Sequence, residues 1–424
     1  MNHTVLLYGA TGYSGRLIAA EGARTGMAKT EGVPGYQMIL AGRDGREVAT
    51  LAAALGMDHR VFGIDDRPTV VRGLSDIDVV INAAGPFALT ADHLAKGALS
   101  AGCHYVDING EADVYMKLDD LGRHAVHRER ALVVSAGHTA AASDLLLDVA
   151  LGELIAAGLG PDPSRKPAEL GAVRIALSRI TSLSRGSLET LWRSLREQVR
   201  VIRLAEPADL NGARGKEHVI WHEPIGKLER TFDFFDRFAE EQKRSPVTEE
   251  SARHTTREVA SAANLVDTLT ARLSVERNNF RAHRIESYVA VGTIGRLTYQ
   301  LGPLLTPLAA MAWARDLARL QFDALPSGPT PRERRDETHV MVLEVEDVFQ
   351  GLVLHWAWHT PNPYAFTARV VVEVAKRVAA GELYGWLTPA EVLQPTKDDL
   401  YGRIEYLRGC ALDERRSPVR EMVG

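Results

Sequence analysis

Three glycines, Gly9, Gly12 and Gly15, stand at intervals of three residues in the stretch GATGYSG. This stretch follows a strand-like apolar run, VLLY, and precedes RLIAAEGAR, which has helical periodicity. In such a turn Gly9 lets the chain leave the strand sharply, Gly12 lets a ligand approach the backbone, and Gly15 lets the helix pack closely on the strand. The N–H groups at the start of a helix attract anions. The stretch therefore predicts a binding site for a nucleotide diphosphate.

The spacing of these glycines departs from the G-x-G-x-x-G pattern of dinucleotide-binding proteins, because Ala10 and Thr11 stand between Gly9 and Gly12. A glycine turn with a purely structural role is therefore an alternative. The context favours the nucleotide. The stretch directly follows an expected strand, opens an expected helix, and is followed by a second strand at the usual distance.

The end of the second expected strand should show which dinucleotide is bound. Chains that bind NAD usually have a carboxylate there, whereas chains that bind NADP have basic side chains near the 2′-phosphate. This sequence reads AGRDGRE, with Arg43 and Arg46. Because guanidinium matches the geometry of phosphate, we predict NADP(H). Asp44 could instead accept a ribose hydroxyl or cap the next helix, and Arg43 could be an ordinary surface charge.

The fourth expected strand ends in NAAGPF, Asn82 to Phe87. Small residues allow a cofactor to lie close to the backbone, and proline suits an abrupt turn. We therefore expect the nicotinamide beside this segment. A plain turn between strand and helix is the alternative.

Hydride chemistry with a nicotinamide usually needs a group that supplies or accepts a proton. Tyr105, Asp107 and Glu111 lie in HYVDINGE, and His138 follows ALVVSAG at the end of another expected strand. We expect Asp107 and His138 to be the leading candidates for proton transfer, and Tyr105 and Glu111 to contact substrate. Each has a structural alternative: Tyr105 could belong to the core, the two acids could hold loops or cap helices, and His138 could be a hydrogen-bonded loop residue.

Two further pairs of polar residues could bind ligands. Arg185 and Ser187, in SRGSLETLW, could dock an anionic part of a substrate, although a helix cap explains Ser187 equally well. His355 and His359, in LVLHWAWHT, would share one face of a strand. Two histidines without a third ligand are a weak metal signal, so we predict no metal site.

These residues need a scaffold that brings the ends of several strands together. Between residues 4 and about 140, short apolar runs alternate with stretches of helical periodicity, which is typical of βαβ units. The six expected strands are TVLLYG, YQMILAG, RVFGID, DVVINAAG, HYVDING and ALVVSAG. Right-handed crossovers place the ends of such strands along one edge, where ligands bind. We therefore predict a doubly wound α/β Rossmann domain over residues 1–140.

The rest of the chain does not continue the regular alternation of strand-like and helical stretches. Residues 141–365 begin with the helical stretch SDLLLDVALGELIAAG and contain the strand-like runs AVRIALSRI, THVMVLEVED and LVLHWAWHT. We expect a second domain of α+β type there that takes part in dimerisation, with its charged part, residues 206–284, at the surface. Residues 366–424 should form a C-terminal helical segment, because the long helical stretch AFTARVVVEVAKRVAAGE opens it.

Composition excludes several classes of protein. The 424 residues are 45% hydrophobic and 25% charged, as in soluble globular enzymes, and the net charge of −5 leaves no basic excess for nucleic acid. The two cysteines, Cys103 and Cys410, have no spacing typical of a metal site or a disulfide framework. We expect no signal peptide, because the first apolar residues lead directly into the glycine turn. We predict a cytoplasmic protein.

The uncharged stretch Leu297–Ala314 requires a separate interpretation. Its length approaches that of a membrane span, but Gly302, Pro303 and Pro307 interrupt it. Packing in a core or interface is the favoured interpretation, with peripheral membrane contact as an alternative and no transmembrane span. A homodimer is expected from this stretch and from the size of the second domain.

Together, GATGYSG, ILAGR, DVVINAAGPF and CHYVDINGE resemble the saccharopine dehydrogenase family, in particular its saccharopine dehydrogenase-like and trans-acting enoyl reductase branch. The late stretch NPYAFTARVVVEVAKRVAAGELYGWLTPAEVL resembles the closing segment of the family, whereas residues 206–330 match nothing. The resemblance implies a Rossmann domain, an α+β substrate domain inserted over residues 141–365, and a closing segment, residues 366–424, that packs back on the Rossmann domain. It also implies contacts to NADP(H) from Gly9, Thr11, Gly12, Tyr13, Ser14, Gly15, Arg43, Ala84, Gly85, Pro86 and Phe87.

The favoured function is an NADPH-dependent reductase of a C=N or conjugated C=C bond in a small-molecule or carrier-linked intermediate. A non-enzymatic sensor of NADP(H) redox state is an alternative, because a binding motif establishes a ligand and not turnover. The glycine turn also opens semialdehyde-type reductases, which need a cysteine nucleophile. Cys103 is the early cysteine, but it begins a strand and not a helix, where a thiolate would be stabilised.

Overall fold

The computed structural model describes residues 3–28, 35–161, 167–179, 183–188, 199–204, 218–223, 228–235, 255–263, 265–290, 311, 327–396 and 411–412. The stretch Leu297–Ala314, except Met311, and Cys410 lie outside the described residues. No helix in the described ranges has the length and apolar character that a bilayer crossing requires.

In the described part of the chain, seven parallel strands form the first sheet, in the order β16-β6-β5-β4-β1-β2-β3. The strands are β1 (His3–Tyr8), β2 (Tyr36–Gly42), β3 (Asp58–Val61), β4 (Val79–Asn82), β5 (His104–Asp107), β6 (Ala131–Val133) and β16 (Gly385–Leu387). All six strands expected from the sequence are present. The strand order reverses between β1 and β4, and ligands of open α/β sheets bind beside the carboxyl ends at such a point.

Local sequence determines where the helices of this domain begin and end. Asp44 and Asp66 cap α2 and α3 by accepting bonds from Glu47 and Thr69. Gly102 ends α4 with a φ of 74°, which favours glycine. The helices are α1 (Tyr13–Arg24), α2 (Gly45–Leu55), α3 (Arg67–Gly73), α4 (Phe87–Ala101), α5 (Ala112–Asp119) and α6 (Gly122–His127).

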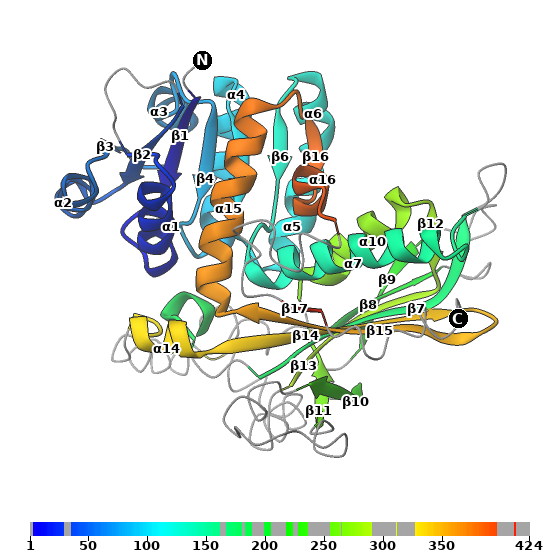
Figure 1. The fold of residues 1–424 in the computed structure, drawn as a ribbon. Helices are drawn as coiled ribbons and strands as arrows, with labels where there is room; N and C mark the ends of the chain where they lie inside the picture. Colours follow the sequence, from blue (N-terminus) through cyan, green and yellow to red (C-terminus); the bar gives the residue numbers. More distant parts are fainter. Residues whose placement is uncertain are drawn as a thin grey trace.

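The C-terminal segment returns to the first domain, as expected. Its long helix α15 (Pro363–Ala380) begins with Asn362 as its cap and packs against α1, β1, β4 and β5 (Figure 1). The segment then adds β16 beside β6 and ends its described helical part with α16 (Pro389–Leu393). The fold class is therefore confirmed, with a seventh strand that the sequence had not predicted.

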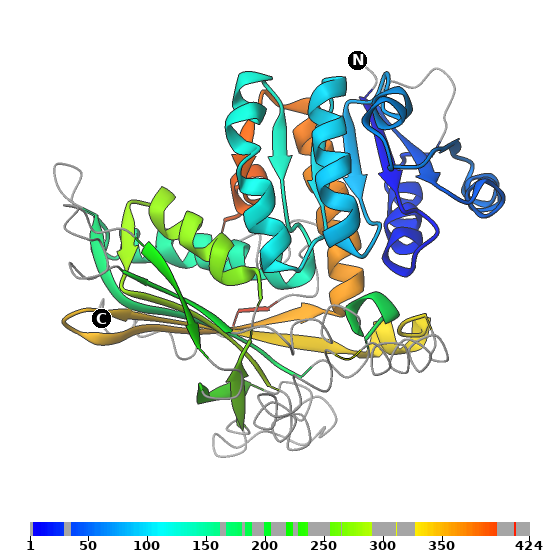
Figure 2. The same ribbon diagram turned by 180° about the vertical axis from the view of Figure 1, so that it is seen from behind.

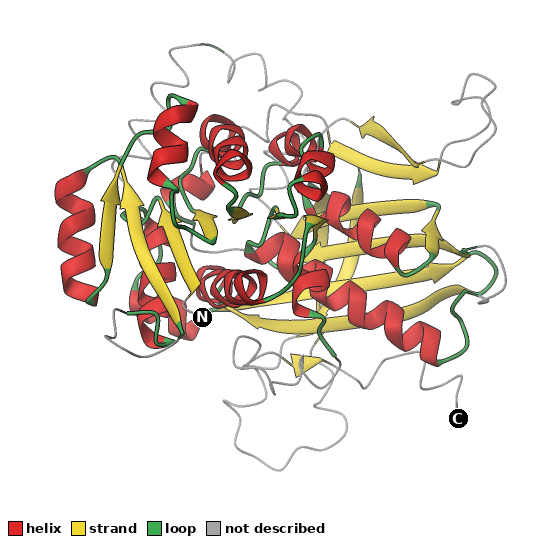
Figure 3. Ribbon diagram, turned by 90° about the horizontal axis from the view of Figure 1, so that it is seen from above, coloured by secondary structure: helices red, strands yellow, loops and turns green. Residues whose placement is uncertain are grey.

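A second, mixed sheet, with ten strands among the described residues, lies beneath the carboxyl ends of the first (Figures 1 and 2). The helices α7 (His138–Ala156) and α10 (Asp267–Arg277) lie over one of its faces (Figure 3). The short helix α14 (Pro331–Asp336) precedes β14. The strands are β7 (Ala168–Leu177), β8 (Val199–Leu204), β9 (His218–Glu223), β10 (Glu229–Phe235), β11 (Thr255–Ala262), β12 (Phe280–Ala282), β13 (Arg284–Ala290), β14 (Thr338–Asp347), β15 (Gly351–Pro361) and β17 (Ala411–Leu412).

The expectation of surface structure over residues 206–284 is wrong for α10. This helix packs against α7 and buries polar as well as apolar side chains, including Asp267 and Ser274. Ser274 donates to the buried carboxylate of Asp144 in α7, which also accepts a 2.7 Å bond from the backbone N–H of Ala390 in α16. One carboxylate thus joins three helices from distant parts of the chain.

Candidate functional site

Each glycine of the first turn has a physical requirement for its small size. Gly9 has a φ of +83°, and a Cβ there would lie 2.6 Å from the backbone nitrogen of Ala84. A Cβ on Gly15 would lie 2.1 Å from the carbonyl oxygen of Gly9, and one on Gly12 would lie 3.3 Å from the same oxygen. The turn is therefore pressed between α1 and the end of β4, and it forms a cradle that side chains would fill.

The start of α1 is suited to an anion. Gly12 is the N-cap residue, no side chain caps the helix, and no acidic side chain lies in its first turn. Gly12 is exposed, and Thr11 and Ser14 are partly exposed. The first-turn amides and the positive end of the helix dipole are thus accessible beside the cradle, which fits a diphosphate.

The end of β2 separates the roles of its charged residues. The carboxylate of Asp44 accepts a 3.0 Å bond from the backbone N–H of Glu47, so Asp44 caps α2. Arg43 and Arg46 are exposed, and neither forms an ion pair with another residue in the described part of the chain. An exposed guanidinium at this strand end is compatible with a 2′-phosphate, and the role of Arg43 stays a prediction.

The segment Asn82–Phe87 forms a braced turn with open space beside it. The side-chain oxygen of Asn82 accepts a 3.0 Å bond from the backbone N–H of Ala84, and the Thr90 hydroxyl donates a 2.6 Å bond to the Ala84 carbonyl. A Cβ built on the exposed Gly85 would meet no described atom within 4 Å. This room is where the sequence places the nicotinamide.

Tyr105 and Asp107 belong to a buried hydrogen-bond network at the ends of β4 and β5. The Tyr105 hydroxyl accepts a 3.1 Å bond from the Asn82 amide and donates a 2.9 Å bond to Asp107. The other carboxylate oxygen of Asp107 accepts bonds from the backbone N–H groups of Ser135, at 2.8 Å, and Asn109, at 3.0 Å. Both side chains are fully buried, and these contacts favour a positioning role over direct contact with substrate.

The burial of Asp107 also changes its acidity. Desolvation raises the pKa of Asp107 to about 6, although the bonds from Ser135, Asn109 and Tyr105 oppose this shift. Burial raises the pKa of Tyr105 well above its usual value, and the neighbouring Asp107 adds to this. The tyrosine therefore keeps its proton and shares it with the carboxylate.

Glu111 is the more accessible of the two predicted carboxylates. Its side chain is partly exposed, and one of its oxygens accepts a 3.3 Å bond from the backbone N–H of Phe87. Phe87 begins α4 directly after the turn that should face the nicotinamide. Glu111 is thus linked to the expected reaction centre without being enclosed by the network of Asp107.

His138 faces the second sheet. Its Nε2 lies 2.8 Å from the Thr360 hydroxyl of β15, and its backbone N–H donates a 2.9 Å bond to the Thr367 hydroxyl of α15. The ring is buried, with its Nδ1 unpaired among the described residues, and it packs edge-on against Phe366. Desolvation lowers the pKa of His138 to about 3, so this histidine is neutral near pH 7. These contacts join the two domains.

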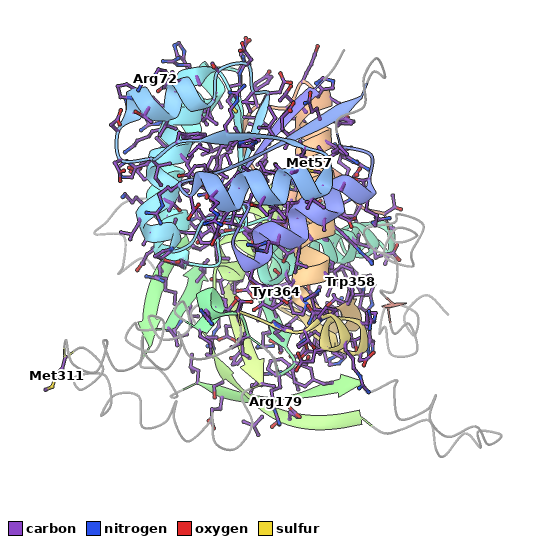
Figure 4. The ribbon with its side chains drawn as sticks, turned by 90° about the vertical axis from the view of Figure 1, so that its left-hand side faces the viewer. Met57, Arg72, Arg179, Met311, Trp358 and Tyr364 are labelled. Atoms are coloured by element: carbon purple, nitrogen blue, oxygen red, sulfur yellow. The ribbon has the colours of Figure 1, made fainter. Side chains whose placement is uncertain are left out.

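The predicted residue Ser187 lies at a junction of hydroxyl groups that sequence reasoning missed. Its hydroxyl is 2.9 Å from that of Tyr364, at the start of α15, and 3.1 Å from that of Ser184. The Tyr364 ring meets the ring of Tyr13, in the glycine turn, edge-on at 5.0 Å. Figure 4 shows Tyr364 between the first domain and the second sheet. Arg185 donates a backbone bond of 3.3 Å to the carbonyl of Ser327 beside this junction.

The sequence contains little that could have revealed Tyr364. It lies within an apolar helix start, far along the chain from both Tyr13 and Ser187. Its capping neighbour Asn362 indicates where the helix begins, but nothing indicates what the tyrosine faces.

The remaining candidates are the histidines of β15 and Cys103. No group of three potential ligand side chains suited to a metal ion exists among the described residues, and His355 lies 3.4 Å from Glu344. Cys103 is fully buried, and desolvation raises the pKa of its thiol, which disfavours a thiolate. The Cys103 nucleophile thus has no support from the geometry.

Comparison with known proteins supports the first domain most strongly. Residues 5–140 match the family described as "Saccharopine dehydrogenase NADP binding domain". A Mycobacterium tuberculosis protein named as a candidate trans-acting enoyl reductase is 29% identical over 136 residues, which span 29% of this chain and 31% of that protein. The chain therefore aligns with about a third of this relative's length. The resemblance to the saccharopine dehydrogenase family is confirmed for the NADP-binding domain.

Two solved structures share the fold over nearly the whole chain. Saccharopine dehydrogenase from Saccharomyces cerevisiae superposes with a TM-score of 0.52 and 14% identity, covering 94% of this chain and 97% of that one. Homospermidine synthase from Legionella pneumophila, in complex with NAD, gives a TM-score of 0.52 and 10% identity over 93% of this chain and 89% of that one. At these identities the comparison shows the fold.

Proposed function

We propose that this chain is an NADP-dependent oxidoreductase that reduces a C=N or conjugated C=C bond of a small-molecule or carrier-linked intermediate. The observation that carries the proposal is the cradle of Gly9, Gly12 and Gly15 at the uncapped start of α1. This cradle lies within the part of the chain that matches an NADP-binding domain. The enoyl reductase name of the mycobacterial relative supports the choice of bond.

The chain's own residues have distinct roles in this proposal. The amides of Gly12, Tyr13 and Ser14 hold the diphosphate, Arg43 holds the 2′-phosphate, and the turn of Ala84 to Phe87 supports the nicotinamide. Bound NADPH would supply the hydride. The second sheet lies below this edge of the first domain and would close the substrate's side of the site (Figure 1).

Proton transfer is best assigned to a group that can reach the substrate. Among the four residues predicted from the sequence, Tyr105, Asp107 and His138 are buried, while Glu111 is partly exposed next to Phe87. We therefore assign Glu111 to contact the substrate. We assign Asp107 to hold Tyr105 and the ends of β5 and β6 in position. His138 and Ser187 remain candidates for shaping the substrate's side of the site.

The proposal is tested by nucleotide titration followed by turnover. Fluorescence titration should show tighter binding of NADPH than of NADH, with the preference reduced in Arg43→Ala. NADPH absorbance should then fall when the protein is mixed with a panel of imines and enones. Failure to bind either nucleotide would remove the proposal as a whole.

A non-enzymatic NADP(H) sensor is the second candidate, and the burial of both predicted proton-transfer residues, Asp107 and His138, is the observation that favours it. The two candidates differ in turnover and not in binding. A protein that binds NADPH but consumes none with any member of the panel would favour the sensor. A cytoplasmic location and a homodimer remain predictions under both.

A further inference from the structure

A segment preceding the second sheet's β14 packs directly on the glycine turn of the first domain. The Tyr13 hydroxyl donates a 2.6 Å bond to the carbonyl of Pro329, and a Cβ on Gly328 would lie 2.6 Å from the Tyr13 ring. Tyr13 is the first residue of α1, so this contact adjoins the amides that should hold the diphosphate. Residues 327–334 therefore belong to the surroundings of the cofactor site.

Arg334 brings a positive charge to this contact. Its guanidinium donates a 2.9 Å bond to the Tyr13 hydroxyl and a 2.6 Å bond to the Pro329 carbonyl, and it lies 5.8 Å from the centre of the Tyr13 ring. Both acceptors are neutral. Burial raises the pKa of Tyr13 while Arg334 opposes the shift, so the hydroxyl keeps its proton.

No carboxylate in the described ranges forms an ion pair with Arg334, although one stands next to it in sequence. Glu333 is used elsewhere: its carboxylate accepts a 2.7 Å bond from the backbone N–H of Thr330, and the Thr330 hydroxyl accepts one from Glu333. This capping box holds α14 and leaves the charge of Arg334 unbalanced. A partly buried guanidinium with neutral partners thus contacts the side chain of Tyr13, whose backbone begins α1, and such a group favours an anionic ligand.

We propose that Arg334 binds the diphosphate of the dinucleotide from the substrate side, completing a site whose other half is the start of α1. The proposal rests on the function proposed above. The neutral contacts to Tyr13 and Pro329 hold the guanidinium near the diphosphate before the nucleotide arrives. The second domain thus contributes directly to cofactor affinity, through a residue that no dinucleotide motif contains.

The test compares dissociation constants for NADPH and NADH in variants of one helix. Arg334→Ala should weaken both nucleotides by about tenfold or more, which corresponds to about 1.4 kcal/mol, because the diphosphate is common to both. Arg334→Lys should restore part of the affinity. The matched control is Arg335→Ala, since Arg335 is exposed on the same short helix, and it should stay within about twofold of the unmodified protein.

Salt and a second variant distinguish charge from packing. The advantage of the unmodified protein over Arg334→Gln should shrink as sodium chloride is raised, because salt screens a charge contact. Tyr13→Phe keeps the charge and should lose less affinity than Arg334→Gln. The proposal would be overturned if Arg334→Ala and Arg334→Gln bound both nucleotides as tightly as the unmodified protein, or if they lost affinity for NADPH alone. It would also be overturned if Tyr13→Phe lost as much affinity as Arg334→Gln and the loss did not depend on salt. If the unmodified protein binds neither nucleotide, the proposed function fails instead.

Discussion

Asp107 shows how a buried carboxylate can be held by the chain itself. Two backbone N–H groups and one tyrosine hydroxyl donate to it: Tyr105 and Asn109 lie beside it in the sequence, and Ser135 lies beyond the next strand. It joins the end of β5 to the loop after β6, next to the turn that should support the nicotinamide. Its contacts therefore fix the shape of the site. When Asp107 is substituted, the stability of the variant must be measured together with its activity, because lost positioning alone could reduce activity.

Substitution of Asp107 should separate these effects. Asp107→Ala leaves the buried amides of Ser135 and Asn109 without an acceptor, so we expect a loss of roughly 2–5 kcal/mol in the free energy of unfolding. Asp107→Asn keeps an acceptor oxygen and should lose less than about 1.5 kcal/mol. Urea unfolding measures both. An alanine variant as stable as the asparagine variant would contradict the positioning role.

His138 should make the protein sensitive to acid. Its pKa is about 3 in the folded chain, below the usual 6.5 that applies after unfolding. Below pH 6.5 the unfolded chain therefore binds a proton that the folded chain refuses, and stability falls as the pH decreases. This single residue should cost about 2 kcal/mol of unfolding free energy between pH 7 and pH 5.

The comparison of variants isolates this histidine. Burial raises the pKa of Asp107 and Asp144 to about 6, and these carboxylates stabilise the folded chain as the pH falls, with the opposite sign. We therefore compare the change between pH 7 and pH 5 in His138→Gln with that in His127→Gln, because His127 is exposed. If the free energy of unfolding fell by the same amount between pH 7 and pH 5 in the two variants, the assignment of this loss to His138 would be wrong.

Among the elements, α1 and α7 place glycine under opposite constraints. Gly15 lies where α1 crosses the turn, and Gly152 lies on the exposed side of α7, where a Cβ would meet no described atom within 4 Å. Both are helical. The difference lies in what packs against them, and this is visible only after the chain has folded.

Alanine at these two positions should therefore act in opposite directions. Gly15→Ala puts a Cβ against the Gly9 carbonyl and should displace α1, abolish NADPH binding and lower the unfolding temperature. Gly152→Ala should raise the free energy of unfolding by about 0.5–1 kcal/mol and leave NADPH affinity unchanged, because glycine is a poor helix former. Retained NADPH binding in Gly15→Ala would show that the turn does not need its close packing.

Across the whole molecule, the glycine turn is one of the places where the two domains meet through side chains. Tyr13 contacts Tyr364 of α15 and residues 328–334, while Tyr364 contacts the serines of residues 183–188. A ligand that orders the start of α1 should therefore order these segments as well, although they are distant in sequence.

Hydrogen exchange in the presence and absence of NADPH can detect this coupling. We expect slower exchange at residues 9–15, 183–188 and 327–336 when NADPH is added. The tip of the β14–β15 hairpin, where Phe349 is 92% exposed, should be unaffected and provides the internal control. Protection limited to residues 9–15 and 84–87 would show that the nucleotide contacts the first domain alone.

The first domain could be predicted closely from its sequence. Its strands are short apolar runs ended by glycine, proline or a polar residue, and its dinucleotide turn depends on contacts between residues near one another in the chain. The capping of α2 by Asp44 is equally local, because the carboxylate reaches an amide three residues on. Local chemistry of this kind is readable without a structure.

The sequence could not predict which side chains contact each other in the folded protein. Tyr105, Asp107 and His138 stand at strand ends in the sequence, but their burial and their bonds to Asn82, Ser135 and Thr360 depend on packing between distant segments. The same holds for the pairing of β16 with β6. Period-two and period-3.6 patterns show which residues turn inward but not which inward residues meet. The amino-acid order by itself thus determined a nucleotide turn and the sheet behind it. The contacts of Tyr13 with Arg334 and Tyr364 were decided by the packing of the two domains. They could not be predicted from the sequence, because a contact between remote residues leaves no periodicity in the chain.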